Sequence, residues 1–478
     1  MNRKSRYIVF LVSCLCGLWL VSCTPKIPDE VEIVILSTTD LHGTFDFFPQ
    51  FSVLVEETKA KHKNVIVVDA GDRFTGNPFN DYWEEKQFPI IDLMNNIGYD
   101  VMVIGNHEFD HGVELLNNRI EETNSAVILA NMEIKGSGLQ NIKPYHIIKK
   151  DGINIAFLGL TQVNERTQKP SVLAKQVVDL KFYDPVKIAM KYRYLRKKSH
   201  VFVALTHMGV DDDAILADSL PELDLIIGGH SHSTLLEPVF QNGVMITQSE
   251  RYARKIGKTT ILLKKGVVSE ITNELINLQT WNGSTDPAVE EKIQVYKKNP
   301  FFTESFATMK YGIPNIEQLG YMMTDAALQL PGVDFSTLNF SGIRMDSLPA
   351  GDLTYGDIFR LSPFNNRIFV FPITSAEFRA FLEVRNCRML PAGFEFTSYK
   401  TPEGVDRIDK IMLPNGQALD ENKHYNLAID SYLFSMYLME YADRATDLGL
   451  FVVDVIVDYM RNNPNMDYRN RPPRVQNN

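Results

Sequence analysis

Apolar residues between positions 32 and 275 gather in short runs that are separated by longer amphipathic stretches. The runs are rich in valine and isoleucine, which is typical of buried β-strands, and several of the stretches have helical periodicity. Strands that alternate with helices predict a layered α/β domain. We expect strands at residues 33–38, 65–69, 101–105, 126–130, 153–159, 201–205 and 223–228, and helices at 51–62, 113–123 and 185–198.

The pattern changes near residue 281, where a charged segment at 286–298 lies between Gly283 and Pro300. A chain of 478 residues exceeds what one hydrophobic core usually organises. We therefore predict an α/β domain at residues 32–282, a linker helix at 283–302 and a second domain at 303–462 with its own strands and helices. The tail beyond residue 462 is rich in Asn, Arg and Pro, and we expect it to fray.

The first 23 residues differ from the rest of the chain. Three basic residues precede an apolar run at 8–21, which is shorter than the roughly 20 residues that span a bilayer. The sequence Leu-Val-Ser-Cys at 20–23 resembles a bacterial lipobox. It predicts a lipoprotein signal peptide at 1–23, cleavage before Cys23 and lipidation of that residue. We expect the protein to be anchored to a bacterial membrane in the cell envelope, periplasmic or surface-facing; an uncleaved N-terminal anchor is the alternative.

Cysteine usage and charge narrow the classes of function. Cleavage would remove Cys14 and Cys16 and commit Cys23 to lipid, so Cys387 alone can form neither an internal disulfide nor a thiol-rich metal site. Any metal ion must then be held by nitrogen and oxygen ligands. Removing three of the 49 basic residues and none of the 59 acidic ones leaves a net charge of −13. This charge disfavours nucleic acid polymers as partners, whereas small anions remain compatible because a metal ion supplies local positive charge.

Candidate metal ligands occur in five short segments, each directly after an apolar run. Five of the ten histidines fall in these segments. Because ligands bind at the carboxyl ends of strands in open α/β sheets, we expect the segments to line one site. Their mixture of imidazole, carboxylate and amide groups suits a borderline divalent ion. The segments are Asp-Leu-His at 40–42, Gly-Asp at 71–72, Gly-Asn-His-Glu-Phe-Asp at 105–110, Thr-His at 206–207 and Gly-His-Ser-His at 229–232.

The spacing within these segments has a chemical meaning. Asp40 and His42 are two residues apart, so on an extended backbone both point the same way and can reach one metal ion; His230 and His232 repeat this spacing. A glycine before Asp72 permits a sharp turn, and the carboxylate there could bridge two ions. Two ions ~3.5–4 Å apart would clamp a phosphoryl group and generate a nucleophile from water near neutral pH. A single histidine of this kind is as often structural, but five such segments in this order favour a metal site.

The order of these motifs resembles the calcineurin-like metallophosphoesterases, and among them the 5′-nucleotidase branch, over roughly residues 32–460. The segments at 69–76 and 105–110 are the most specific signatures. The resemblance implies a four-layer α-β-β-α domain, a smaller α+β C-terminal domain and two divalent ions (zinc, manganese, cobalt or magnesium). It implies that the first ion is held by Asp40, His42, Asp72 and His232, and the second by Asp72, Asn106, His207 and His230.

The same resemblance implies a catalytic pair. His107 is similar to the family's catalytic histidine, and Asp110 three residues later would orient it. The histidine would then stabilise the transition state and protonate the leaving alkoxide, which is ordinary general acid–base chemistry.

Residues 339–366 resemble the nucleotide-binding C-terminal domain of the family. By resemblance, Asn339 and Arg344 would contact polar groups of the substrate, and Phe364 would stack on its base. The family's Gly-Gly-Asp-Gly-aromatic loop, which gives a second stacking ring, is missing here. Residues 430–440 stand in its place: one of Tyr432, Phe434 and Tyr437 would substitute, or the stretch is a helix that packs in the core.

Three functions compete on this basis. The first is hydrolysis of nucleoside 5′-monophosphates or related nucleotides, with the linker permitting the domain rotation that the family uses. The second is a phosphohydrolase for cyclic nucleotides, nucleotide sugars or other phosphate esters. The third is a non-catalytic envelope protein that binds metal or ligand, which His107 and Asp110 disfavour because they serve turnover better than metal retention. A sulfur-ester hydrolase has no supporting cysteine near the metal segments. The sequence leaves the oligomeric state open.

Overall fold

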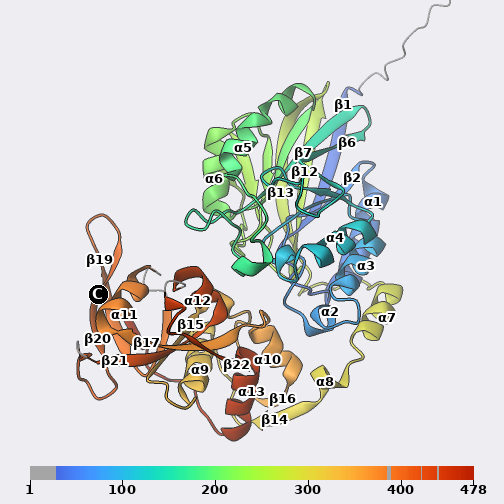
Figure 1. The fold of residues 1–478 in the computed structure, drawn as a ribbon. Coiled ribbons are helices and arrows are strands. Elements are labelled where there is room, and N and C mark those ends of the chain that lie inside the picture. Colours follow the sequence, from blue (N-terminus) through green and yellow to red (C-terminus); the bar gives the residue numbers. More distant parts are fainter. Residues whose placement is uncertain (1–27, 385–388, 421–422, 439–440, 478) are drawn as a thin grey trace, which may run out of the picture.

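The computed structural model describes residues 28–384, 389–420, 423–438 and 441–477. These residues form an N-terminal domain and a smaller C-terminal domain, joined by the segment that carries α7 (Pro287–Tyr296) and α8 (Pro300–Thr303) (Figure 1). The predicted signal peptide at 1–23 lies outside the described residues. Within the described part of the chain, no helix combines the length and apolar character needed to cross a bilayer.

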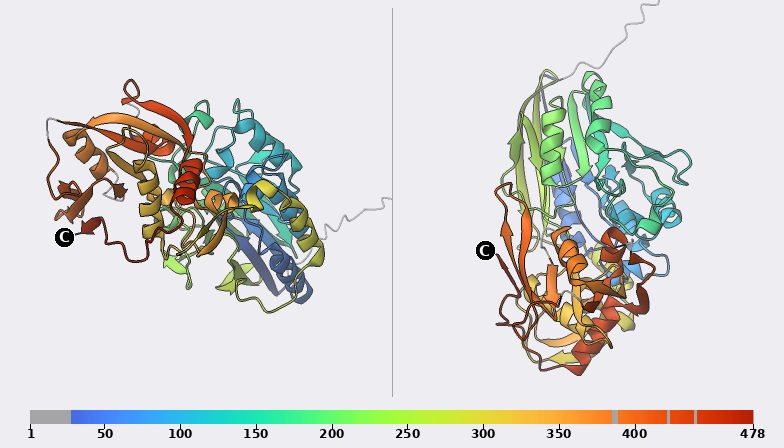
Figure 2. Two further views of the ribbon diagram at one scale, coloured as in Figure 1. Left: turned by 90° about the horizontal axis from the view of Figure 1, so that it is seen from below. Right: turned by 60° about the vertical axis from the view of Figure 1, so that its left-hand side comes forward.

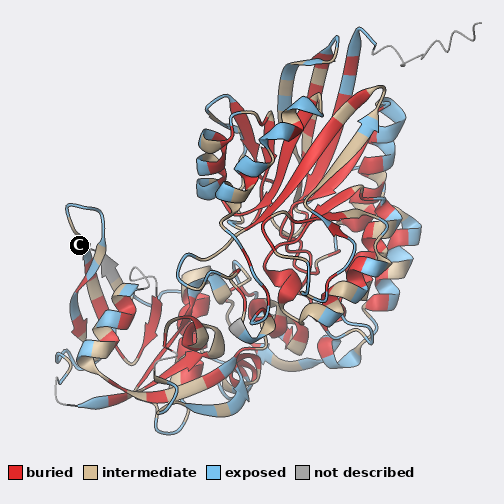
Figure 3. Ribbon diagram, turned by 45° about the horizontal axis from the view of Figure 1, so that its top comes forward, coloured by how far each residue is buried: buried red, intermediate tan, exposed pale blue. Residues whose placement is uncertain are grey.

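Two sheets pack face to face in the N-terminal domain (Figures 1 and 2). Between them lies a core of fully buried residues such as Ile33, Val68, Phe157 and Val203, and the central strands are buried along most of their length (Figure 3). The first sheet, in spatial order, is β13 (Val267–Asn277), β12 (Lys255–Lys264), β1 (Glu30–Thr38), β2 (Val65–Asp69), β3 (Val101–Val103), β4 (Ala126–Ile128) and β5 (Ile142–Lys143). The second is β10 (Val239–Gln241), β11 (Val244–Thr247), β9 (Leu225–Ile227), β8 (Val201–His207), β7 (Ile153–Thr161) and β6 (Tyr145–Lys150).

Helices cover the outer face of each sheet. Phe51 and Leu54 of α1 pack with Val34 and Leu36 of the first sheet, and Leu216 of α6 belongs to the cluster that covers the second. The predicted four-layer α-β-β-α arrangement is therefore confirmed. The helices are α1 (Phe48–Lys61), α2 (Pro78–Asp81), α3 (Phe88–Ile97) and α4 (Val113–Glu122) beside the first sheet, and α5 (Pro185–Lys191) and α6 (Val210–Ser219) beside the second.

The C-terminal domain is built on one mixed sheet, and the predicted α+β class is confirmed. Its strands, in spatial order, are β18 (Met389–Ala392), β15 (Phe335–Asn339), β21 (His424–Asp430), β17 (Arg367–Thr374) and β22 (Thr446–Phe451). One face packs on α9 (Ile316–Leu328), α10 (Tyr355–Leu361) and α13 (Val452–Asn462), and the other on α11 (Ser375–Val384) and α12 (Ser431–Tyr437). Smaller sheets pair β14 (Ser305–Met309) with β16 (Gly351–Thr354), and β19 (Glu395–Lys400) with β20 (Asp406–Met412) and β23 (Val475–Asn477).

The segment predicted as a linker helix packs firmly on the N-terminal domain. Asp286 caps α7 by accepting hydrogen bonds from the backbone N–H groups of residues 288 and 289, and it also accepts one from Ser52 in α1. Ile293 and Tyr296 of α7 are buried, and the Tyr296 hydroxyl donates to Asp92 of α3 at 2.5 Å. Any hinge between the domains therefore lies after α7, toward α8.

The prediction of a frayed tail was wrong. Tyr468 is almost fully buried and donates a 2.7 Å hydrogen bond to Asp325. The guanidinium of Arg474 binds the same carboxylate through two bonds of 2.7 and 2.8 Å, and the following residues join β19 as β23. A bidentate pair of this kind orders a segment whose sequence has no apolar periodicity.

Candidate metal centre

The structure brings all seven predicted metal ligands together at one end of the two facing sheets. Each ligand lies at or just beyond the carboxyl end of a strand, as the sequence predicted. Asp40 and His42 follow β1, Asp72 follows β2, Asn106 follows β3, His207 ends β8, and His230 and His232 follow β9.

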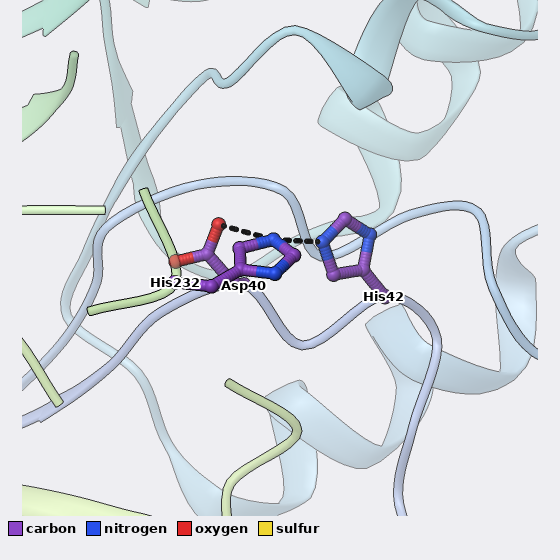
Figure 4. Close-up of side chains that lie close together, drawn as sticks. All are labelled: Asp40, His42 and His232. Atoms are coloured by element: carbon purple, nitrogen blue, oxygen red, sulfur yellow. Dashed lines mark hydrogen bonds and ion pairs between the residues drawn. The ribbon is translucent and has the colours of Figure 1, made fainter. Parts of the chain in front are cut away.

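The ligand atoms form three overlapping groups. Within each group, the nitrogen and oxygen atoms lie within 4.8 Å of one another. His232 Nε2 lies 3.0 Å from His42 Nε2 and 3.4 Å from a carboxylate oxygen of Asp40 (Figure 4). The groups are Asp40, His42 and His232; His42, Asp72 and His107; and Asp72, His207 and His230. His42 and Asp72 each belong to two groups, and Asp72 is the residue that joins the group with His207 and His230 to the one with His42.

The backbone reaches this geometry through left-handed turns. Asp40, His42, Asp72, His230 and His232 have φ angles of +50°, +47°, +55°, +78° and +54°. Non-glycine residues rarely adopt this region, and those that do are concentrated at functional sites. The expectation that Asp40 and His42 converge because they share one side of an extended backbone was therefore wrong. A pair of turns aims both side chains inward.

Gly71 supplies the sharp turn that was expected beside Asp72. Its φ is +89°, and a Cβ atom there would lie only 2.9 Å from both the Gly105 nitrogen and Nδ1 of His207. The loops after β2 and β3 therefore approach each other, and His207, too closely for any side chain at this position.

Hydrogen bonds fix which nitrogen of two histidines faces the centre. Nδ1 of His207 lies 2.8 Å from the Ala70 carbonyl oxygen, and Nδ1 of His42 lies 3.0 Å from that of Thr75. Because a carbonyl oxygen only accepts, each Nδ1 carries the hydrogen, and in a neutral ring Nε2 presents a lone pair. The buried Nε2 of His207 lies 2.9 Å from the Asp72 carboxylate, with which it pairs when the ring is protonated. A divalent cation fits this pair of electron-rich atoms.

His232 differs from these two rings. A guanidinium nitrogen of Arg251 lies 3.2 Å from its Nδ1 and one of Arg344 lies 3.1 Å from its Nε2, so a donor faces each ring nitrogen, although a neutral ring accepts at only one of them. The Nε2 of His232 also lies 3.0 Å from Nε2 of His42. It could bind a cation through Nε2 only if Arg251 released its Nδ1 and Arg344 moved away from Nε2.

Burial sets the protonation of the cluster. It lowers the pKa of His42 and of His232 well below the usual value, and Arg344 lowers both further. Burial, assisted by the charge of His207, lowers the pKa of His230 to about 3. These rings are neutral at pH 7, as metal ligands must be. Burial also lowers the pKa of His207, but Asp72 outweighs it and raises that pKa to about 10, so a proton and a cation compete for the same site.

His107 and Asp110 form the predicted pair. Nδ1 of His107 lies 2.7 Å from the Asp110 carboxylate, and the backbone N–H of His107 donates to Asp72 at 2.8 Å. Burial lowers the pKa of His107, but Asp110 and Asp72 together outweigh it and raise the pKa above 6.5. The ring is therefore oriented by one carboxylate and tied to the cluster through its own backbone.

Arg344 enters the cluster from the C-terminal domain. Its two terminal nitrogens lie 3.1 Å from Nε2 of His107, 3.1 Å from that of His232 and 3.5 Å from that of His42. Phe364 also belongs to the C-terminal domain, and its ring stacks on His107 with 5.2 Å between centroids and 19° between planes. The ring predicted to stack on a base thus covers the histidine in this arrangement.

A cavity of about 780 Å³ lies between the domains and opens onto the cluster. The predicted substrate-binding residues Asn339, Arg344 and Phe364 all line it. Of the three candidate second rings, Tyr432 lines the cavity, whereas Phe434 is buried and stacks on Phe369 in the core. Residues 431–437 are therefore a core helix, as one interpretation predicted, with its first aromatic residue at the cavity wall.

Glu108 organises the loops that carry the ligands. Its buried carboxylate accepts hydrogen bonds of 2.6 to 3.2 Å from the backbone N–H groups of Asp72, Arg73, Phe74 and Gly105. It thereby joins the loop after β2 to the loop after β3.

Replacing Glu108 with alanine should lower the free energy of unfolding by about 3–5 kcal/mol, because four buried amides and the buried guanidinium of Arg73 would lose an anionic partner. Chemical denaturation measures this loss. The matched change Glu114→Ala, at an exposed position in the first turn of α4, should stay within about 0.5 kcal/mol. Equal effects for the two variants would contradict the assigned role.

The fold and the clustered His and Asp side chains define a metal-dependent phosphoester hydrolase. Residues 33–234 match the family model of the calcineurin-like phosphoesterases, and residues 311–436 match that of the 5′-nucleotidase C-terminal domain. The chain belongs to the calcineurin-like phosphoesterase family and carries the 5′-nucleotidase type of C-terminal domain.

Known proteins resemble the chain over most of its length. The 5′-nucleotidase of Vibrio cholerae is 27% identical over 84% of this chain and 84% of its own. The 5′-nucleotidase precursor of Thermus thermophilus has a TM-score of 0.82 at 20% identity, covering 93% of this chain and 99% of that one. The sulfate thiohydrolase SoxB of Thermus thermophilus has a TM-score of 0.81 at 16% identity, covering 94% and 97%. Fold alone therefore does not fix the substrate.

Proposed function

We propose that this protein hydrolyses nucleoside 5′-monophosphates or related nucleotides to nucleoside and phosphate at a site that holds two divalent ions. The observation that carries the proposal is the position of Asp72, which is grouped with His42 on one side and with His207 and His230 on the other, and which lines the interdomain cavity. A central carboxylate with a separate set of ligands on each side is the arrangement that two adjacent cations require.

The chain offers one ligand set on each side of Asp72. Asp40, His42 and His232 would complete the first site, with His232 joining once Arg251 leaves its Nδ1 and Arg344 leaves its Nε2. Asn106, His207 and His230 would complete the second; the Asn106 side-chain oxygen already lies 3.0 Å from His230. When bound, the ions supply Lewis acidity at the phosphoryl group and lower the pKa of water. Zinc, manganese, cobalt and magnesium all suit this donor set.

His107 would act as the general acid for the oxygen of the leaving group. Its Nδ1 is engaged by Asp110, so its Nε2 is the atom that faces the cavity and exchanges a proton with the departing alkoxide. Arg344 would bind the phosphoryl oxygens, since its guanidinium already lies among the histidine nitrogens of the cluster and supplies fixed donors.

Nucleotide recognition would come from the C-terminal domain. The family of that domain and the names of relatives such as the Vibrio cholerae 5′-nucleotidase support a nucleotide as substrate. Phe364 can offer a ring face to a base after moving off His107, and Asn339 offers polar contacts at the same wall. Cyclic nucleotides, nucleotide sugars and other phosphate esters are the alternative substrates, and a non-catalytic envelope protein is the alternative function.

We place the protein in the cell envelope, with a lipid on Cys23 as its membrane anchor. The basic segment, the short apolar run and the lipobox-like sequence before Cys23 support this location. Metabolic labelling with a fatty acid tests it, because a Cys23→Ser variant should lose the label and leave the membrane fraction.

Phosphate release from a panel of nucleotides tests the proposed activity. We expect hydrolysis of nucleoside 5′-monophosphates, loss of activity with a chelator and recovery when a divalent metal is added back. The panel should include cyclic and sugar-linked nucleotides and a generic aryl phosphate. Hydrolysis of the aryl phosphate while every nucleotide stays intact would reject the nucleotide assignment.

A further inference from the structure

We propose that Asp346 and the loop formed by residues 250–255 constitute an interdomain latch that positions Arg344 at the metal centre. Asp346 belongs to the C-terminal domain and lies two residues after Arg344; the loop belongs to the N-terminal domain and connects β11 to β12. The evidence for the latch is a set of contacts between the two domains. Its effect on catalysis rests on the proposed function, in which Arg344 binds the phosphoryl group.

The loop is held in an unusual backbone conformation. Two consecutive residues that are not glycine, Tyr252 and Ala253, have φ angles of +65° and +53°. Such pairs are strained and persist only where surrounding contacts hold them. Here Ala253 is buried, Tyr252 donates its backbone N–H to the Asp40 carbonyl at 3.0 Å, and Glu250 pairs with Arg254 and Lys255. The loop is thus a fixed platform attached to the backbone of the metal centre.

Two arginines of this platform hold one carboxylate of the other domain. Arg251 donates to one oxygen of Asp346 at 2.7 Å, and Arg254 donates to the other at 3.1 Å. Both guanidinium groups also lie over the Tyr252 ring, at 4.9 and 5.3 Å from its centroid. The ring limits their freedom, so pairing with Asp346 costs less side-chain entropy than an ordinary surface ion pair does.

The loop also holds the residue that enters the centre. The Tyr252 hydroxyl donates to the backbone carbonyl of Arg344 at 2.9 Å. Asp346 and this carbonyl are therefore bound to the same loop, on either side of Met345. With both points fixed, the Arg344 side chain can reach His107 and His232 in only a narrow range of directions. Asp346 is a positioning residue, because it touches no proposed ligand and acts through Arg344.

The variant Asp346→Ala tests the latch, and Asp352→Ala is the matched control. Both aspartates are exposed and lie on the C-terminal domain, but Asp352 hydrogen-bonds to Thr308 within that domain. Hydrogen–deuterium exchange of the metal-loaded full chain is the first measurement. We expect Asp346→Ala to raise exchange in residues 250–255 and 343–347, and Asp352→Ala to leave both segments unchanged. This readout needs no substrate, so it decides on the latch even if the proposed activity is absent.

Kinetics of a double-mutant cycle test the positioning role. We expect kcat/KM for a nucleoside monophosphate to fall about tenfold in Asp346→Ala, as small misplacements of a substrate-binding group do. The value should fall less in Arg254→Ala, because Arg251 still holds Asp346, and the double variant should match Asp346→Ala, because that change already removes the pair with Arg254. Unchanged exchange in Asp346→Ala would overturn the latch. Raised exchange with unchanged kcat/KM, or additive losses in the double variant, would overturn its role in positioning Arg344.

Discussion

Replacing Asp72 with asparagine should abolish metal binding at both sites and reduce turnover by more than about 10³-fold. The carboxylate is buried, belongs to two ligand groups and lies 2.9 Å from Nε2 of His207. Altering groups that merely support a metal ligand already costs 10–100-fold in affinity, so removing the shared anion should cost more. Elemental analysis of the purified variant, alongside phosphate release, measures both effects.

The Asp72 variant should keep its fold. Asparagine retains an oxygen that can accept the hydrogen bond now donated by the His107 backbone, and it tolerates the left-handed φ of +55° better than most residues do. The matched change Asp211→Asn, at an exposed position in the first turn of α6, should retain both metal and turnover. An Asp72→Asn protein that carried a full complement of divalent ions would reject the shared-ligand interpretation.

Much of the fold and all of the predicted ligand cluster could be inferred from local sequence. Buried parallel strands are continuous apolar runs, so β1, β2, β7 and β8 were predicted from the sequence. The polar residue after each run marked the carboxyl end of that strand. Six strands of the two sheets were missed: β5, β6, β10, β11, β12 and β13. They are short or partly exposed, so their sequences lack the long continuous apolar runs of the central strands.

The contacts between the domains could not be inferred in the same way. Arg251 lies in a loop without any motif, and its partners Asp346 and His232 are 95 and 19 residues away. No feature of the neighbouring sequence distinguishes such an arginine from a solvated surface residue. The left-handed turns at Asp40 and His42 were also beyond prediction, because Asp and His adopt this conformation only where tertiary contacts impose it.

Replacing His107 with alanine should lower kcat by about 10²–10⁴-fold, the usual contribution of a general acid–base residue, while the metal content stays unchanged. Metal should be retained because His107 contacts Asp72 through its backbone N–H at 2.8 Å, and alanine preserves that bond. Its side chain faces the cavity and Arg344. Turnover and metal content measured on the same preparation therefore separate a catalytic histidine from a structural ligand.

Asp110→Asn should reproduce part of the fall in kcat that is expected for His107→Ala. The amide oxygen of the new side chain would still accept a hydrogen bond from Nδ1 of His107, but the negative charge that raises the pKa of His107 would be gone. Substrates with a poor leaving group should then suffer most, since they depend on proton transfer, and an aryl phosphate with a good leaving group should suffer least. His424→Ala, at an exposed position where β21 begins, should leave both substrates unaffected. Equal losses for good and poor leaving groups in Asp110→Asn would show that the pair positions substrate and transfers no proton.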